Sequence, residues 1–328
     1  MLIKRITGLT ILVTILHFTA CKKEEGNNNN AGYTKGKNRF TVMVDNVERE
    51  YYVHIPADYT GNAAVPLVFV LHGTSGNGEK FYDISGWKEL GEEENFISVY
   101  PSSGRYKIFN FGDSTVQNTT KWNILPEGTF IFMPGYTGLD DIKFLKKVVL
   151  EMQLKFNIDT GMIYMNGFSN GGQMAAKCAV EMSNIFAAVA SNASTFNKDT
   201  VYAPQRRLPV LFQIGNEDYG PGNTGPAIPL NSFSYVISTP DVPVIGGKYY
   251  NKARKYINNF SLDSVYTISG DTNSVMVASY HSLTPGDTLN VFRYVFVKNL
   301  GHIYPNGINH WMNAPRHHWA WMRQYRKP

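Results

Sequence analysis

From Arg39 onward, apolar and polar residues follow two periodicities along the chain. Short β-branched and aromatic runs predict strands, and longer stretches with apolar residues every three or four positions predict helices. The predicted strands are Phe40–Val44, Tyr51–Ile55, Leu67–Leu71, Phe96–Tyr100, Met162–Asn166, Phe186–Ala190, Val210–Ile214 and Val291–Val297. Leu67–Leu71 and Met162–Asn166 are apolar almost throughout, which is typical of strands buried on both faces. The pattern predicts an α/β fold with a mostly parallel central sheet of about eight strands and helices on both faces.

The clearest predicted helix runs from Leu139 to Phe156, where apolar residues recur at helical spacing and lysines lie on the other face. Shorter helical stretches are Gln173–Val180 and a closing helix at Trp311–Tyr325. Asp45-Asn46 separates the first two strands and favours a turn, so these strands are predicted to pair antiparallel.

The first twenty residues have the parts of a secretory signal. Lys4 and Arg5 precede an apolar run that ends at Phe18 and is shorter than the roughly 18–20 residues that a membrane span needs. Cys21 follows two small residues, which resembles a bacterial lipoprotein signal in which the cysteine becomes the lipidated first residue. The alternative is an ordinary secretory peptide followed by an incidental cysteine.

The segment after Cys21 is polar and low in complexity, with asparagine at each position from 27 to 30, and it predicts a flexible tether. We therefore expect a lipoprotein signal peptide at residues 1–20, a lipid-anchored tether at 21–37 and a folded domain at 38–328. The start of the tether also resembles the lipoprotein surface-export signals of Bacteroidetes. This likeness predicts a secreted lipoprotein of the outer membrane or cell surface of a Gram-negative bacterium.

Charge and cysteine content narrow the possible partners. The formal net charge is +5, and removal of Lys4 and Arg5 with the signal leaves 5 − 2 = +3. The positive charge is unclustered, so we expect no nucleic-acid partner and membrane contact through the lipid anchor only. If Cys21 carries lipid, Cys178 is the one remaining cysteine, and the mature fold is expected to lack an internal disulfide.

The pattern G-x-S-x-G occurs at residues 167–171, after a predicted strand and before a predicted helix. In that context it predicts a nucleophile elbow, a tight strand-to-helix turn that exposes a serine, here Ser169. Gly167 and Gly171 leave room for the turn, and the helix N-terminus offers N–H groups to a negatively charged oxygen.

The dipeptide His72-Gly73 follows the predicted strand Leu67–Leu71. In α/β-hydrolases the loop after this strand donates one N–H to the oxyanion, and a glycine there lets the backbone approach the substrate. We assign the two oxyanion donors to the backbone N–H groups of Thr74 and Asn170.

A serine hydroxyl needs a base to take its proton and an acid to orient that base, in the chain order Ser, Asp or Glu, His. Asp218 follows the predicted strand Val210–Ile214, and His302 follows Val291–Val297. Both are therefore expected at the carboxyl edge of the sheet with Ser169. The adjacent Glu217 is the alternative acid.

Two groups of residues invite a metal interpretation. His310, His317 and His318 lie on or near the closing helix, but no carboxylate or cysteine joins them at the spacing of a metal site. Asp140 and Asp141 begin a predicted helix, where carboxylates cap free N–H groups. We predict surface or partly buried histidines, helix-capping carboxylates, no metal and no cofactor.

Five blocks in order resemble the polyhydroxybutyrate depolymerase-like esterases, which include feruloyl and acetyl-xylan esterases of carbohydrate esterase family one. The blocks are residues 66–73, 139–145, 167–172, 215–218 and 301–307, and the resemblance covers nearly all of the chain after Arg39. It implies an α/β-hydrolase catalytic domain with the triad Ser169, Asp218 and His302.

The chain departs from the family pattern at three positions. Ile214 stands where the family usually has histidine, residues 304–307 read Tyr-Pro-Asn-Gly where it has Trp-Pro-Gly, and Thr74 stands where it often has cysteine. A further block, Trp122-Asn123, matches. By this resemblance Trp122 and Tyr304 are candidate walls of a substrate pocket, and ordinary core residues are the alternative.

The expected function is an extracytoplasmic serine carboxylic ester hydrolase with an acyl-enzyme mechanism, acting on feruloyl or acetyl esters of plant polysaccharide. The expected partner is a small-molecule or polysaccharide ester. Three alternatives stay open: an esterase for polyhydroxyalkanoate or short acyl groups, a serine peptidase of the prolyl-oligopeptidase type, and a non-catalytic surface binding protein on a hydrolase scaffold.

Overall fold

The computed structural model describes residues 32–125, 130–194, 203–240 and 248–328. The compact unit runs from Thr34 to Pro328. Its first strand begins at Gly36, and the domain boundary predicted at residue 38 stays a prediction. The predicted signal peptide, Cys21 and most of the predicted tether lie outside the described residues. No helix within the described ranges is long and apolar enough to cross a membrane.

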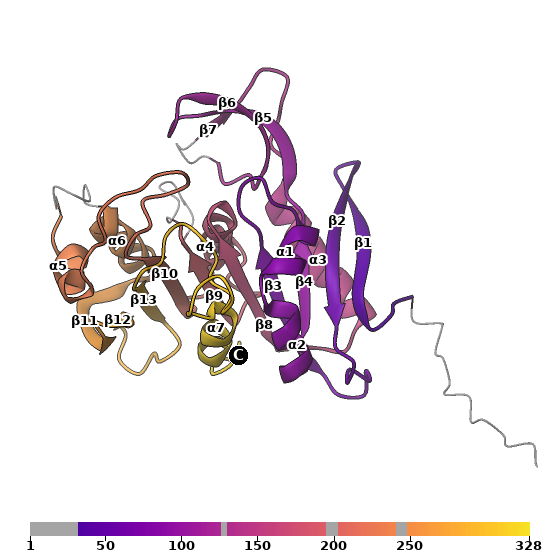
Figure 1. The fold of residues 1–328 in the computed structure, drawn as a ribbon. Coiled ribbons are helices and arrows are strands. Elements are labelled where there is room, and N and C mark those ends of the chain that lie inside the picture. The colour runs from indigo at the N-terminus through magenta and orange to yellow at the C-terminus, as the bar shows by residue number, and fades with distance from the viewer. Residues whose placement is uncertain (1–31, 126–129, 195–202, 241–247) are drawn as a thin grey trace, which may run out of the picture. The chain divides into compact units, whose positions relative to one another are not determined.

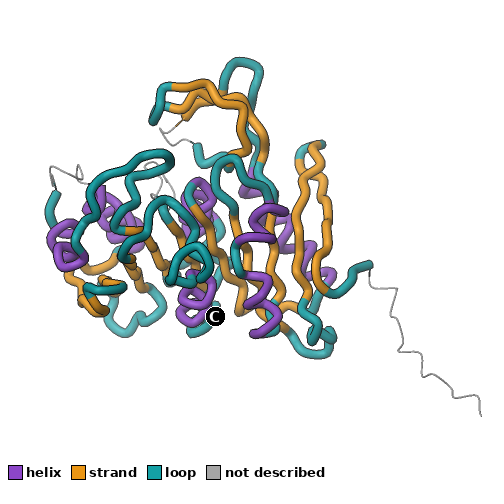
Figure 2. The backbone as a smooth tube through the Cα atoms, viewed as in Figure 1, coloured by secondary structure: helices purple, strands orange, loops and turns teal. Residues whose placement is uncertain are grey.

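A ten-stranded sheet forms the centre of the unit, in the order β1-β2-β4-β3-β8-β9-β10-β13-β12-β11 (Figures 1 and 2). Its strands are β1 (Gly36–Val44), β2 (Val47–Ile55), β3 (Val65–Leu71), β4 (Ile97–Pro101), β8 (Ile158–Phe168), β9 (Ala188–Asn192), β10 (Val210–Gly215), β11 (Leu262–Asp271), β12 (Val275–Ser282) and β13 (Val291–Val297). The six strands from β4 to β13 in this order pair in parallel, and the two at each end pair antiparallel. The predicted mostly parallel α/β sheet is confirmed.

Helices cover both faces of this sheet. They are α1 (Gly78–Ile84), α2 (Trp87–Glu94), α3 (Asp141–Lys155), α4 (Asn170–Glu181), α5 (Phe233–Ser238), α6 (Lys248–Phe260) and α7 (Ala314–Met322), with a 3₁₀ turn, η1, at Leu230–Ser232. Helices α1, α2 and α7 pack on one face, where Trp87 and Trp319 lie in a buried aromatic cluster. The predicted helices at Leu139–Phe156 and Trp311–Tyr325 correspond to α3 and α7, each two or three residues shorter at its start.

Each predicted strand has a counterpart in the central sheet, and five further strands were not predicted. β11 and β12 form a hairpin that extends the sheet beyond β13. A separate three-stranded sheet, hereafter the arm, consists of β5 (Gly104–Asn110), β6 (Thr115–Lys121) and β7 (Phe130–Phe132) (Figure 1). Strands β6 and β11 are mostly polar and exposed, so they lack the apolar runs on which the prediction depended.

The first hairpin shows why local sequence gives this local structure. Asp45 and Asn46 have φ values of 50° and 63°, a conformation that these two residue types adopt more readily than most. They join β1 to β2 in the antiparallel register Val44↔Val47, as the Asp45-Asn46 pair predicts.

Candidate active site

Ser169 lies in the tight turn between the end of β8 and the start of α4. Its φ of 53° is in the left-handed region, which is strained for a residue with a side chain. The flanking glycines are required, because a Cβ on Gly167 would lie 2.1 Å from the carbonyl oxygen of Gly171, and one on Gly171 would lie 2.3 Å from that of His72. The predicted strand–serine–helix geometry is present.

The structure brings Ser169, His302 and Asp218 together from three separate loops. The Ser169 Oγ lies 2.9 Å from His302 Nε2, and His302 Nδ1 lies 2.8 Å from Asp218 Oδ1. His302 follows β13 and Asp218 follows β10, so both reach the carboxyl edge of the sheet beside the turn after β8. With Nδ1–H donating to the carboxylate, Nε2 is free to accept the serine proton.

Asp218 is the carboxylate that contacts His302, and its neighbours keep it ionised. Burial raises the pKa of this carboxyl, but the hydrogen bond and charge of His302, the backbone N–H of Gly220 and the charge of Lys252 outweigh burial and leave the pKa below its ordinary value. The side chain is only 2% exposed. A buried carboxylate in this position holds the imidazole in one orientation and favours its protonated form.

His72 holds the loop that follows β3. Its Nε2 accepts a hydrogen bond from the backbone N–H of Ser103 at 3.1 Å, so the proton of the neutral ring is on Nδ1, which donates to the Gly73 carbonyl at 2.7 Å. Burial lowers the pKa of this imidazole to about 4, which keeps the ring neutral. Because the N–H and C=O of a trans peptide point in opposite directions, a fixed Gly73 carbonyl turns the Thr74 N–H away from His72.

The other predicted donor belongs to the first residue of α4. The first N–H groups of a helix have no intrahelical acceptor, so the Asn170 N–H is available to an oxygen bound at Ser169. Gly73 lies close by, since a Cβ on it would be 3.2 Å from Ser169 Cβ. The loop after β3 and the start of α4 therefore approach the serine from two sides.

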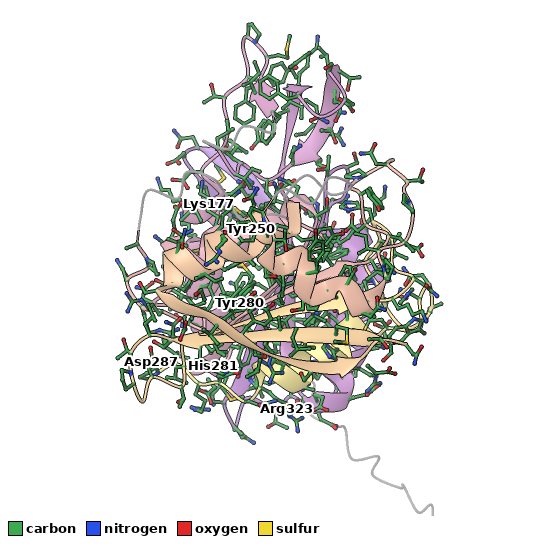
Figure 3. The ribbon with its side chains drawn as sticks, turned by 90° about the vertical axis from the view of Figure 1, so that its left-hand side faces the viewer. Lys177, Tyr250, Tyr280, His281, Asp287 and Arg323 are labelled. Carbon is green, nitrogen blue, oxygen red and sulfur yellow. The ribbon has the colours of Figure 1, made fainter. Side chains whose placement is uncertain are left out.

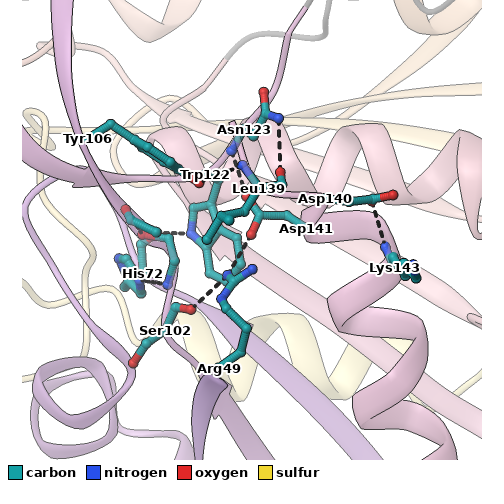
Figure 4. Close-up of polar contacts among 12 residues, drawn as sticks. Arg49, His72, Ser102, Tyr106, Trp122, Asn123, Leu139, Asp140, Asp141 and Lys143 are labelled. Atoms are coloured by element: carbon teal, nitrogen blue, oxygen red, sulfur yellow. Dashed lines mark hydrogen bonds and ion pairs between the residues drawn. The ribbon is translucent and has the colours of Figure 1, made fainter. Parts of the chain in front are cut away.

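Residues at the base of the arm join these two segments, and the sequence did not predict this contact. The Trp122 backbone N–H donates to Asn170 Oδ1 at 2.6 Å. Its indole N–H donates to the His72 carbonyl at 2.9 Å, as Figure 4 shows. The edge of β6 also binds the loop after β3, because the Ser75 N–H donates to the Thr120 carbonyl at 3.0 Å. One aromatic residue thus ties both predicted donor segments to the arm.

The structure does not support Trp122 and Tyr304 as walls of a substrate pocket. Trp122 is fully buried, and Tyr304 is 6% exposed. The Tyr304 hydroxyl accepts from the indole N–H of Trp87 at 2.7 Å and from the amide of Asn166 at 3.2 Å, so it belongs to the core beneath the site. Trp122 instead binds the two loops that carry the predicted oxyanion donors, and Tyr304 packs against Phe168, the residue before Ser169.

Asn192, at the end of β9, supports the site and was not indicated by the sequence. Its backbone carbonyl accepts from the Ser169 N–H at 2.9 Å, and its side-chain amide donates to the carbonyl of Gly167 at 2.9 Å. The same amide donates to Asn166 Oδ1 at 2.9 Å. Asn192 therefore holds both sides of the strained turn. Its signal in the sequence was weak, because a polar residue ending an apolar strand is common.

Asp140 and Asp141 have different roles, and the prediction that both cap the helix holds for Asp140 alone. Asp140 is the N-cap of α3 and accepts from the Lys143 N–H at 2.8 Å. Asp141 is buried and forms an ion pair with Arg49 at 2.6 Å, while its other oxygen accepts from the Asn123 N–H (Figure 4). This ion pair anchors the segment that follows Trp122 to the central sheet.

The C-terminal histidines have different surroundings, and the prediction that they are at the surface or partly buried is wrong for His318. His318 is fully buried between Asn166 and Gln213, and the ring of His310 contacts the Lys298 carbonyl at 3.2 Å. Burial lowers the pKa of His318 well below its ordinary value. Among the described residues there is no group of three or more His, Cys, Asp or Glu side chains arranged to hold a metal ion.

No protein-family model matches the chain. The bifunctional acetylxylan esterase/xylanase XynS20E of Neocallimastix patriciarum is 27% identical over 172 residues, which are 52% of this chain and 21% of that protein. Poly(3-hydroxyalkanoate) depolymerase C of Paucimonas lemoignei is 23% identical over 261 residues, which are 67% of this chain and 57% of that protein. The chain thus spans less than two thirds of the length of either relative.

Among solved structures, the acetyl xylan esterase from Aspergillus awamori matches with a TM-score of 0.57 at 15% sequence identity, covering 87% of this chain and 99% of that one. In sequence the chain is similar to esterases, at 23–27% identity over half to two thirds of its length. The α/β-hydrolase fold expected of such an esterase homologue is confirmed. Its relatives include acetylxylan esterases, feruloyl esterases and a polyhydroxyalkanoate depolymerase.

Proposed function

We propose that this protein is a serine carboxylic ester hydrolase that acts on acetyl or feruloyl esters of plant polysaccharide through an acyl-enzyme. The observation that carries the proposal is the continuous hydrogen-bonded chain from Ser169 through His302 to Asp218. Relatives named for acetylxylan and feruloyl ester hydrolysis support the substrate class. This arrangement favours catalysis over the alternative of a non-catalytic binding protein, because binding alone does not require a serine hydroxyl hydrogen-bonded to a base and an acid.

The proposed reaction has two halves. Ser169 Oγ attacks the ester carbonyl carbon while His302 Nε2 takes its proton, and the backbone N–H groups of Thr74 and Asn170 bind the oxyanion that forms. Collapse of this intermediate breaks the bond to the alcohol, which leaves with the proton from His302. Water then attacks the acyl-enzyme with the same base, releasing the carboxylic acid and restoring Ser169.

The experiment compares the purified wild-type chain with Ser169→Ala on a panel of acetyl, feruloyl, butyryl, hydroxybutyryl and peptide substrates. We expect turnover of acetyl or feruloyl esters and its loss in the variant. A fluorophosphonate probe should label the wild type and the control Ser234→Ala, whose hydroxyl lies on the exposed α5, and should miss Ser169→Ala. Equal labelling of all three proteins contradicts the nucleophile. Preference for the hydroxybutyryl or peptide substrate contradicts the substrate class.

We also propose that Cys21 carries lipid and holds the enzyme at the outer membrane or cell surface. Its support is the sequence alone, since a signal-like segment ends directly before this cysteine. Growth with labelled palmitate should tag the wild type and lose the tag in Cys21→Ser. Cys178→Ser is the matched control, because Cys178 is buried in α4. Label that persists in Cys21→Ser, or that disappears in Cys178→Ser alone, contradicts this location.

A further inference from the structure

A polar groove lies at the far end of the central sheet from Ser169. It has a volume of about 570 Å³ and is bounded by β11, β12, β13, the loop after β12 and Tyr325 near the C-terminus. This volume is within the range of about 300–1,000 Å³ that is usual for small-ligand sites. Figure 3 shows His281 and Asp287 at this end of the unit.

The strand register places its polar side chains in a row. Thr267 on β11 pairs with Ser279 on β12, and Ser279 pairs with Arg293 on β13. Directly paired residues in antiparallel strands lie on the same face, so two hydroxyls and a guanidinium form one line across three strands. His281 lies two residues after Ser279 on β12 and so shares that face.

Arg293 lines the groove without an ion-pair partner among the described residues. It is partly buried and forms no hydrogen bond or ion pair with any residue that the structure describes. The carboxylate that lines the groove, Asp287, accepts from the backbone N–H groups of Leu289 and Asn290 and from the Ser282 hydroxyl. A partly buried cation without a partner is costly, so an anion that enters the groove gains a charge-assisted hydrogen bond.

We propose that this groove binds a uronic acid unit of a polysaccharide. The guanidinium of Arg293 matches the planar fork of a carboxylate, and Thr267, Ser279 and His281 offer hydrogen bonds to sugar hydroxyls. A groove of this size and polarity suits a hydroxylated ring rather than a bare inorganic anion or an apolar chain. The choice of a sugar acid rests on the proposed polysaccharide esterase function, whereas the anion preference rests on Arg293 alone.

The groove is separate from the reaction. Arg293 is the third residue of β13, near its amino end, whereas His302 follows the carboxyl end of the same strand. The two sites are therefore at opposite edges of the sheet, and a single acyl group cannot occupy both. The groove holds a distant part of the same polymer, which raises the local concentration of ester groups near Ser169.

The test measures binding on the Ser169→Ala chain, so that no ester is consumed. Calorimetric titration compares a xylo-oligosaccharide that carries one glucuronic acid branch with the unbranched oligosaccharide of the same length. We expect the acidic oligosaccharide to bind at least about tenfold more tightly, an advantage that falls with added salt and disappears in Arg293→Gln. Arg323→Gln, an exposed arginine paired with Glu94 outside the groove, is the matched control and should bind as before.

Three outcomes overturn the proposal: equal binding of the two oligosaccharides, unchanged binding in Arg293→Gln, or inorganic phosphate binding as tightly as the acidic sugar. The Arg293→Gln change made in the otherwise wild-type chain should leave turnover of a small soluble ester unchanged. That measurement separates the two proposals. Binding without ester turnover contradicts the proposed function alone, and turnover without acid-selective binding contradicts the groove alone.

Discussion

Acid should loosen the loop that carries one predicted oxyanion donor, because that loop depends on a neutral His72. In the folded protein the ring donates through Nδ1 to Gly73 and accepts at Nε2 from the Ser103 N–H. A second proton would occupy Nε2, where it faces the Ser103 N–H instead of a lone pair. Protonation therefore breaks one hydrogen bond and buries a charge in a side chain that is 1% exposed.

The size of the effect follows from the pKa. Burial lowers the pKa of His72 from 6.5 to about 4, and each pKa unit corresponds to about 1.4 kcal/mol. Because the folded pKa is the lower one, the unfolded chain binds more protons between these values. The stabilisation is fully present above about pH 6.5 and is lost as the pH falls toward 4. At pH 4 the free energy of unfolding is lower by about 3 kcal/mol.

The assay measures the free energy of unfolding by urea from pH 7.5 to pH 4 for the wild type and His72→Gln. Glutamine keeps an acceptor near Ser103 but does not titrate. The variant should lose about 3 kcal/mol less than the wild type over this range, while the contributions of all other groups cancel in the comparison. If the free energy of unfolding depends on pH in the same way in both proteins, His72 is not a buried neutral imidazole with a lowered pKa.

Two further tests concern carboxylates. Asp218→Asn should reduce kcat by up to about 10⁴ with little change in fold, whereas the kcat of Glu217→Gln should stay within roughly tenfold of the wild type. If Glu217→Gln has the larger effect on one ester at one pH, the acid is misassigned. Asp141→Asn leaves Arg49 buried without its counter-charge and should cost about 3–5 kcal/mol of unfolding free energy, against about 1 kcal/mol for the exposed cap variant Asp140→Ala. Similar losses in the two variants, measured by urea unfolding, contradict the buried ion pair.

The sequence was most informative where local chemistry determines local geometry. The G-x-S-x-G turn permits few backbone conformations. The apolar segments before and after it are buried, and they form the strand β8 and the helix α4. The order of Ser169, Asp218 and His302 along the chain also anticipated their meeting, because each follows a parallel strand and parallel strands end at one edge.

The arm and the contacts of Trp122 could not be derived in this way. Strand β6 reads Thr-Val-Gln-Asn-Thr-Thr-Lys, which has no apolar alternation, and it forms a strand because β5 supplies its hydrogen-bonding partner. The hydrogen bond between Trp122 and Asn170 joins residues 48 positions apart. Such pairings depend on the completed tertiary fold and leave no pattern in either segment alone.

The position of Trp122 gives the protein an optical reporter of its own. The chain has five tryptophans, and this indole is hydrogen-bonded to the loop that carries Thr74 while its backbone is bonded to the residue after Ser169. Its fluorescence therefore depends on how these two segments are arranged. The difference between the emission of the wild type and of Trp122→Phe isolates that signal, so we expect the proposed acylation of Ser169 to be followed in real time without an attached dye.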